Sequence, residues 1–297
     1  MNHDSVEIDD LVDEDKHQTP FFLHRPPERP LIIAHRGYRA CFPENTLLAF
    51  NRSVGRCDMI ELDVRLSRDG EIVIFHDEFL NRTSDGANRA RQLGIASLRL
   101  QDWSLSQLQQ LDVGSWFLEA DPFDSLGLGL VEREELGALI PQRIPRFDEV
   151  LAWSRDQQIP LNIELKDLSV EQENCRLADA VIASIKRSKV EKLILLSSFN
   201  HSLLRYCRQL EPRIARAALQ EVTPPPQLCS YLLDLGVCAY HPQDAITDRG
   251  LLSELHSSGI AVNVFTVNDA SRQHQLNALG VTGIITDYPG LEQGWRR

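Results

Sequence analysis

Histidines and carboxylates crowd into one short part of the chain, residues 31–86. His35 directly follows an apolar run, and His76 ends another. Between them, Glu61 and Asp63 alternate with apolar residues, which puts both acids on the same face of a strand. Unpaired charges at such positions are costly unless a metal or a substrate satisfies them. The combination is typical of a metal-assisted phosphodiester hydrolase.

The turn between two of these runs predicts how they pair. Asp69-Gly70 is a strong signal for a hairpin that is closed by a two-residue turn. That turn places Asp63 opposite His76, and residues opposite each other on paired strands point to the same face. We therefore expect Glu61, Asp63 and His76 to share one surface.

Short β-branched runs alternate with amphipathic stretches along the chain, which predicts parallel strands connected by helices. Strands are expected at residues 31–35, 59–64, 161–165, 193–198, 214–219, 236–240, 260–266 and 283–286. Helices are expected at residues 46–54, 146–157, 171–188, 203–210, 251–257 and 270–279. This pattern predicts an α/β fold, a (β/α)₈ TIM-type barrel with its site at the C-terminal ends of the strands. The hairpin, with its return strand at residues 71–76, follows the second strand, and an insertion of about residues 80–144 lies at the barrel mouth.

Negative charge is concentrated at the start of the chain. The first 16 residues contain seven acidic residues and one lysine, so they carry −6 of the net charge of −12. We interpret residues 1–29 as an acidic, disordered arm and residues 30–297 as one barrel domain. Both parts are acidic, which gives no electrostatic support for binding nucleic acid or anionic membranes.

The sequence also bears on the compartment. Its acidic start lacks the basic and apolar segments of a signal peptide, and no later run has the apolar length that spans a bilayer. The six cysteines show neither a Cys-x-x-Cys pair nor zinc-ligand spacing, which predicts reduced thiols. We expect a cytoplasmic protein without stable membrane anchoring. The oligomeric state stays open.

Five motifs, in this order, resemble the glycerophosphodiester phosphodiesterase family. They are IIAHRGYRACFPENTLLAF, IELDVRLSRDGEIVIFHDEFLNRTSDG, LNIELK, VNVFTVND and GIITDYPG, and together they cover about residues 31–290. The resemblance implies a phosphodiesterase barrel that uses one divalent cation. It also implies the reaction, hydrolysis of a glycerophosphodiester to sn-glycerol 3-phosphate and an alcohol.

The resemblance assigns roles to the acidic residues and the histidines. Glu61, Asp63 and Glu164 match the family's metal ligands, and hard cations such as Mg²⁺ and Ca²⁺ prefer carboxylate oxygens. His35 and His76 match the acid/base pair, a role that suits imidazole near neutral pH. Which histidine is the base stays open, as does the nucleophile, either water or the substrate's own glycerol hydroxyl through a cyclic phosphate.

Three further positions are candidates for contacts with the substrate. Arg36 and Lys166 would hold the phosphate, although both could instead pair with the metal carboxylates. Phe265 stands where family members commonly carry tryptophan, which makes it a candidate for the substrate pocket. Glu44 begins a helix, where it complements the helix dipole, and it could also orient His35.

The leading hypothesis is an active phosphodiesterase that acts on deacylated phospholipids such as glycerophosphocholine or glycerophosphoethanolamine. A lysophospholipase D is an alternative, but it would need an apolar groove and attraction to membranes, which the acidic charge disfavours. A non-catalytic barrel used as a binding module is a second alternative. Such a barrel would have lost a histidine or a ligand carboxylate, and none is missing.

Overall fold

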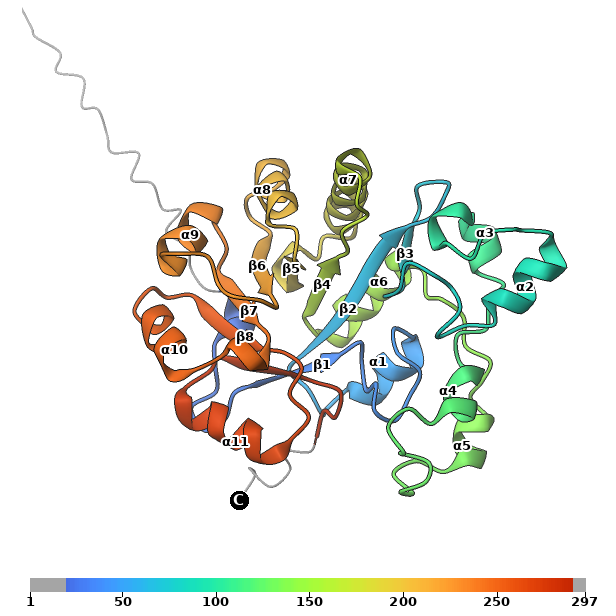
Figure 1. Cartoon of the computed structure of the whole chain (residues 1–297), viewed down its shortest axis with the longest axis horizontal. Helices are drawn as coiled ribbons and strands as arrows, with labels where there is room; N and C mark the ends of the chain where they lie inside the picture. Colours follow the sequence, from blue (N-terminus) through green and yellow to red (C-terminus); the bar gives the residue numbers. More distant parts are fainter. Residues whose placement is uncertain (1–19, 291–297) are drawn as a thin grey trace, which may run out of the picture.

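Eight parallel strands close into a barrel in the computed structural model of the chain, which describes residues 20–290 (Figure 1). The strands are β1 (Leu31–His35), β2 (Met59–Leu66), β4 (Leu161–Leu165), β5 (Ile194–Ser198), β6 (Ala215–Gln220), β7 (Ala239–Pro242), β8 (Ala261–Val264) and β9 (Gly283–Thr286). Each strand pairs with its neighbours in this order, and β1 pairs with both β2 and β9, which closes the ring. The predicted barrel is confirmed.

Helices cover the outside of the ring, and Figure 1 shows α7 to α11 arranged around the strands. The barrel helices are α1 (Leu47–Ser53), α6 (Phe147–Gln157), α7 (Glu171–Ser188), α8 (His201–Leu210), α9 (Leu228–Leu235), α10 (Arg249–His256) and α11 (Ala270–Leu279). Helix α7 buries Leu177, Val181 and Ile185, whose spacing of four residues forms a single apolar stripe. Within residues 20–290, none of the helices has both the length and the apolar character needed to cross a membrane.

One barrel helix and the strand after it depart from the expectation. The sequence pattern predicts a strand at residues 236–240 with no helix directly before it. In the structure, Gly236 follows α9 with a φ of +73°, a left-handed conformation that ends helices and favours glycine. Strand β7 therefore begins at Ala239 instead.

A ninth strand, β3 (Ile72–Ile74), runs antiparallel to β2, as the hairpin signal predicts. The predicted two-residue turn is wrong. The Ser67 N–H donates to the Glu71 carbonyl at 2.9 Å, so these two residues pair across a three-residue turn. Gly70 ends that turn with a φ of +80°.

The extra turn residue shifts the hairpin register by one, so the predicted pairing of Asp63 with His76 is also wrong. Phe75 takes the position opposite Asp63, and its N–H donates to the Asp63 carbonyl at 3.1 Å. His76 nevertheless lines the same cavity as Glu61. It can do so because β3 ends at Ile74, after which the strand's alternation no longer dictates where the side chain points.

The segment between β3 and α6 folds into short helices that pack on two apolar clusters. One cluster joins Trp103 and Leu100 to Phe75 beside the hairpin. The other joins Phe117 to Phe42, near α1. The helices of this segment are α2 (Gly86–Leu93), α3 (Leu105–Leu108), α4 (Ser115–Ala120) and α5 (Arg133–Gly137). Short 3₁₀ turns complete the structure at Phe21–Leu23, Leu100–Asp102, Glu191–Leu193 and Asp244–Ile246.

The barrel interior changes from apolar to polar along the strands. On β2, Met59 belongs to the apolar cluster inside the barrel, and Glu61 and Asp63 follow on the same face because side chains alternate. Phe22 and Leu23 pack into that cluster from the chain before β1. The ionisable groups are therefore held at the C-terminal ends of the strands.

Most of the predicted acidic arm, residues 1–19, lies outside the described residues. The cysteines all fall within the described part, and all six are free thiols, as predicted.

A buried histidine inside the barrel makes folding stability depend on pH. His241 on β7 is fully buried, its Nε2 lies 3.0 Å from the Asn263 amide, and burial lowers its pKa from 6.5 to about 3. Between these values the unfolded chain binds a proton that the folded chain does not. The free energy of unfolding should thus fall by about 1.4 kcal/mol per pH unit below pH 6.5 from this group.

His241→Gln should remove this contribution. Urea unfolding between pH 7 and pH 5 should show a smaller loss of stability per pH unit in the variant than in the wild type. An unchanged slope would contradict the assignment.

Candidate active site

A cavity of about 580 Å³ lies at the C-terminal ends of the strands. The predicted site residues in its wall are His35, Arg36, Glu61, His76, Glu164, Lys166 and Phe265. Asp63 is fully buried behind this wall, with its Oδ1 3.3 Å from the Lys166 Nζ. The fold therefore brings the predicted residues together at one site.

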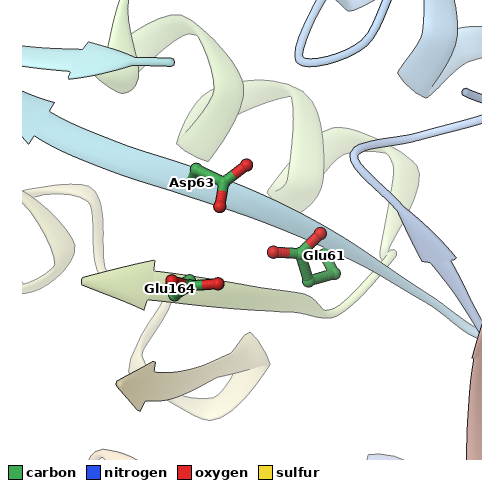
Figure 2. A group of neighbouring side chains, drawn as sticks. All are labelled: Glu61, Asp63 and Glu164. Atoms are coloured by element: carbon green, nitrogen blue, oxygen red, sulfur yellow. The ribbon is translucent and has the colours of Figure 1, made fainter. Parts of the chain in front are cut away.

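Three carboxylates converge at the wall of the cavity (Figure 2). Glu61 and Asp63 project from β2, and Glu164 projects from the neighbouring strand β4, where it lies in register beside Asp63. One oxygen of each carboxylate lies within 4.8 Å of the others. An oxygen-only donor set suits a hard divalent cation, so these residues fit the metal that the resemblance implies.

The pKa values of the three carboxyl groups show that their negative charges are costly when no cation is bound. Burial and the charges of its two acidic neighbours raise the pKa of Glu61 well above its usual range, and burial also raises the pKa of Glu164. Burial alone would raise the pKa of Asp63, but the charges of Lys166 and Arg36 hold it well below its usual range. The buried Oδ1 of Asp63 accepts no hydrogen bond from the described residues, and its ion-pair partner there is Lys166 at 3.3 Å, so a metal could take this oxygen as a ligand.

His35 is oriented by a carboxylate from the other end of the chain. Its Nδ1 lies 2.7 Å from Oδ1 of Asp287, which directly follows β9. Burial alone would raise the pKa of Asp287, but the hydrogen bond with His35 and the charge of Arg39 lower it, so the carboxylate is ionised and only accepts. The His35 proton therefore sits on Nδ1. Nε2, 4.0 Å from Glu61, is left to exchange protons in the cavity.

Asp287 is a candidate positioning residue that the sequence reasoning missed. Asn268 and Arg39 donate to its carboxylate at 2.7 and 3.1 Å, which fixes its position. The available signal was an acidic residue directly after the last strand, in the motif GIITDYPG. The suggestion that Glu44 orients His35 is not supported, since Asp287 occupies that place.

Glu44 instead holds arginines together. It accepts from Arg36 at 2.8 Å, from Arg39 at 2.9 Å and from Arg82 at 2.8 Å. Burial alone would raise the pKa of Glu44, but these three charges lower it far below its usual range. The carboxylate is therefore the centre of a buried ionic network behind the cavity.

His76 has a carboxylate partner of its own. Its Nδ1 lies 2.6 Å from Oδ1 of Asp77, and Arg82 donates to the other oxygen of Asp77 at 2.6 Å. The His76 side chain is 31% exposed, against 14% for His35. Both histidines thus have a carboxylate on Nδ1, which keeps Nε2 as the atom for proton exchange.

The two predicted phosphate-binding residues both contact metal-site carboxylates. Lys166 Nζ lies 2.5 Å from Glu164 Oε1, and Asp63 and Glu164 raise the pKa of Lys166 against the effect of burial. Arg36 Nε lies 3.2 Å from Asp63 Oδ2, and the Arg36 N–H donates to Glu61 at 2.9 Å. These positive charges offset the acidic trio and also line the cavity.

The opposite side of the cavity carries groups of another kind. Phe265 forms an edge-to-face pair with Phe199, with ring centroids 5.8 Å apart. Glu221 also lines this side, whereas the buried side chains of Asn162 and Ser197 line the cavity next to the carboxylates. Sequence reasoning identified only Phe265 among these five residues. Asn162 stands in the motif LNIELK but was given no role, and the other three residues belong to no quoted motif.

Comparison with known proteins agrees with this geometry. The sequence model of the Glycerophosphoryl diester phosphodiesterase family matches residues 35–291. The chain is 32% identical over 263 residues to the glycerophosphodiester phosphodiesterase of Bacillus altitudinis, which covers 87% of this chain and 94% of that protein. A Silicibacter pomeroyi structure is similar at a TM-score of 0.77 and 26% identity, covering 92% of this chain and 95% of that one.

A second solved structure includes a ligand. It is a phosphodiesterase from Oleispira antarctica in complex with the product sn-glycerol-3-phosphate. It has a TM-score of 0.73 and 29% identity, and covers 90% of this chain and 97% of that one.

Proposed function

Because the chain belongs to the glycerophosphoryl diester phosphodiesterase family, we propose that it hydrolyses glycerophosphodiesters to sn-glycerol 3-phosphate and an alcohol with the help of one divalent cation. One observation carries the proposal. Two histidines, each with a carboxylate on Nδ1, line the same cavity as Glu61 and Glu164, which converge with the buried Asp63. The relative solved with sn-glycerol-3-phosphate supports the choice of product.

Glu61, Asp63 and Glu164 would hold the cation, Mg²⁺ or Ca²⁺. When bound, the ion supplies a Lewis acid that offsets negative charge on the phosphoryl oxygens. Lys166 remains protonated beside the trio, so its ammonium can add to the positive charge that faces the phosphate. Arg36 lies on the same wall of the cavity and presents guanidinium donors that suit phosphoryl oxygens.

The histidines move the protons. One accepts a proton at Nε2 from the attacking hydroxyl, and the other gives a proton to the alcohol oxygen as its bond to phosphorus breaks. Asp287 and Asp77 hold the two rings with Nδ1 turned away from the reaction and stabilise each ring when it is charged. After each turnover, the ring that acted as base loses its extra proton and the ring that acted as acid regains one.

Release of glycerol 3-phosphate, followed with glycerol-3-phosphate dehydrogenase, tests this function. The enzyme should release it from glycerophosphodiesters in the presence of Mg²⁺ or Ca²⁺. Cleavage of a lysophospholipid yields lysophosphatidic acid instead, so it is followed by release of the free alcohol, which should be slower. If only lysophospholipids were cleaved, the lysophospholipase D alternative would hold. If no ester were cleaved with either metal, the barrel would be a binding module.

We also place the enzyme in the cytoplasm, acting on a small-molecule substrate without nucleic acid or a membrane anchor. Six free thiols and a net charge of −12 support this placement.

A further inference from the structure

The cavity has two chemically different sides. Strands β1, β2 and β4 supply the acidic trio and His35, and His76 comes from just after β3. The segments after β5, β6 and β8 supply Phe199, Glu221 and Phe265. A phosphodiester bound at the catalytic side has two arms, the glycerol and the head group, which must find places elsewhere in the cavity. The following inference rests on the proposed function.

The glycerol arm suits the buried polar part of the cavity. Asn162 and Ser197 are 1% and 0% exposed, yet the amide of Asn162 and the hydroxyl of Ser197 have no hydrogen-bond partner among the described residues. Buried polar groups are costly unless they are paired, so these atoms call for a partner with hydroxyl groups. Ser197 lies in register beside Glu164, which places this partner next to the metal ligands.

The remaining wall is suited to a different ligand. Phe199 and Phe265 present an aromatic pair, and Phe199 is 38% exposed, so this wall is open to solvent. The exposed side chain of Glu221 makes no ion pair with any described residue, whereas the nearby wall residue Asp244 is paired with Arg272 at 2.7 Å. An aromatic pair with one unpaired carboxylate is the chemistry that binds an organic cation.

We propose that Phe199, Phe265 and Glu221 bind the head group, and that the preferred substrates are glycerophosphodiesters whose alcohol carries an ammonium group. Aromatic rings attract cations through the negative face of the π system, and the carboxylate adds a matching charge. Lys166 and Arg36 lie beside the acidic trio, where they would face the phosphate. A zwitterionic substrate thus meets positive charge at its phosphate and negative charge at its head group. A neutral polyol or an acyl chain would leave Glu221 without a partner.

Two substrates of equal shape, one charged and one neutral at the head group, separate the effect of the head-group charge from the effect of its shape. Glycerophosphocholine and the ester of glycerol phosphate with 3,3-dimethylbutanol differ in a single atom, because carbon replaces the quaternary nitrogen. The wild-type enzyme should cleave the choline ester with a kcat/KM about tenfold higher, as expected for a cation held by two rings and a partly exposed carboxylate. The ratio for one preparation does not depend on how much of the enzyme is folded.

Substitutions test whether the preference for the choline ester comes from the three proposed head-group residues. Glu221→Gln, Phe199→Leu and Phe265→Leu should each lower the ratio about threefold, and Phe265→Trp should keep or increase it, since tryptophan binds cations best. Glu119→Gln is the matched control. Glu119 is an exposed glutamate on α4 that does not line the cavity, and its replacement should leave the ratio at the wild-type value.

Two results would overturn the inference. One is an equal or higher kcat/KM for the uncharged ester in the wild type. The other is a preference for choline that persists in all three of the lowering variants. If neither ester is cleaved, the proposed function fails. The inference is then decided by calorimetric Kd values for the same two esters, measured in EDTA, where a ratio near one overturns it and tighter binding of the choline ester supports it.

Discussion

Replacement of either cavity histidine by alanine should lower kcat by about 10²-fold or more, the usual contribution of a general acid or base. His35 and His76 each lie next to the acidic trio and each is held by its own carboxylate at Nδ1. Neither ring can therefore take over the proton transfer of the other. Steady-state release of glycerol 3-phosphate measures the effect. His24→Ala is the matched control, because His24 is exposed beside the residues that pack at the other end of the barrel.

An activated substrate separates the two histidines. 4-Nitrophenol is a far better leaving group than an aliphatic alcohol, so its ester with glycerol phosphate needs little help from a general acid. The variant that lacks the acid should recover most of its activity on this ester, whereas the variant that lacks the base should stay impaired. Near-native turnover of an aliphatic ester in either alanine variant would refute the assignment of that histidine.

Removal of divalent cations should abolish activity, and Mg²⁺ or Ca²⁺ should restore it. The loss should be about 10³-fold or more, because a metal contributes several kcal/mol to stabilising charge on phosphoryl oxygens. The measurement is the same assay after treatment with EDTA, with and without each metal. Full activity in the chelator would contradict the role of Glu61, Asp63 and Glu164.

Binding can be measured apart from activity. A cation that binds only the folded protein raises its Tm, so Mg²⁺ or Ca²⁺ should raise the Tm of the wild type but not that of Asp63→Asn. The raised pKa values of Glu61 and Glu164 also predict how metal binding depends on pH. The metal must displace protons from these carboxyl groups, so its affinity should increase with pH. Asp58→Asn is a control outside the cavity. An equal Tm increase in Asp63→Asn would place the ion elsewhere.

The features that the sequence predicts correctly are those that depend on local residue patterns, such as helix bounds and the residues that share one face of a strand. Helices at residues 171–188 and 270–279 begin and end where the pattern indicates, because the apolar stripe of the first and the cap of the second at Asp269 are visible in the chain itself. Glu61 and Asp63 were found because alternation in a strand determines which side chains share a face.

The failures are of a different kind. The hairpin register depended on whether Gly70 is part of a two-residue or a three-residue turn, and both turns accept the same residues. Asp287 could not be assigned to His35, since their contact exists only after the ring has closed. The helices α2 to α5 are short, and they are held by packing on neighbouring elements that no sequence periodicity reveals.

The hydrogen bond between His35 and Asp287 joins residues that are 252 positions apart, one at the end of the first strand and the other directly after the last. During synthesis, the histidine emerges from the ribosome 252 residues before its orienting carboxylate. A nascent chain can therefore form helices and most of the sheet while its proton-transfer site is still incomplete. The proposed proton-transfer site is complete only after translation has passed the last strand.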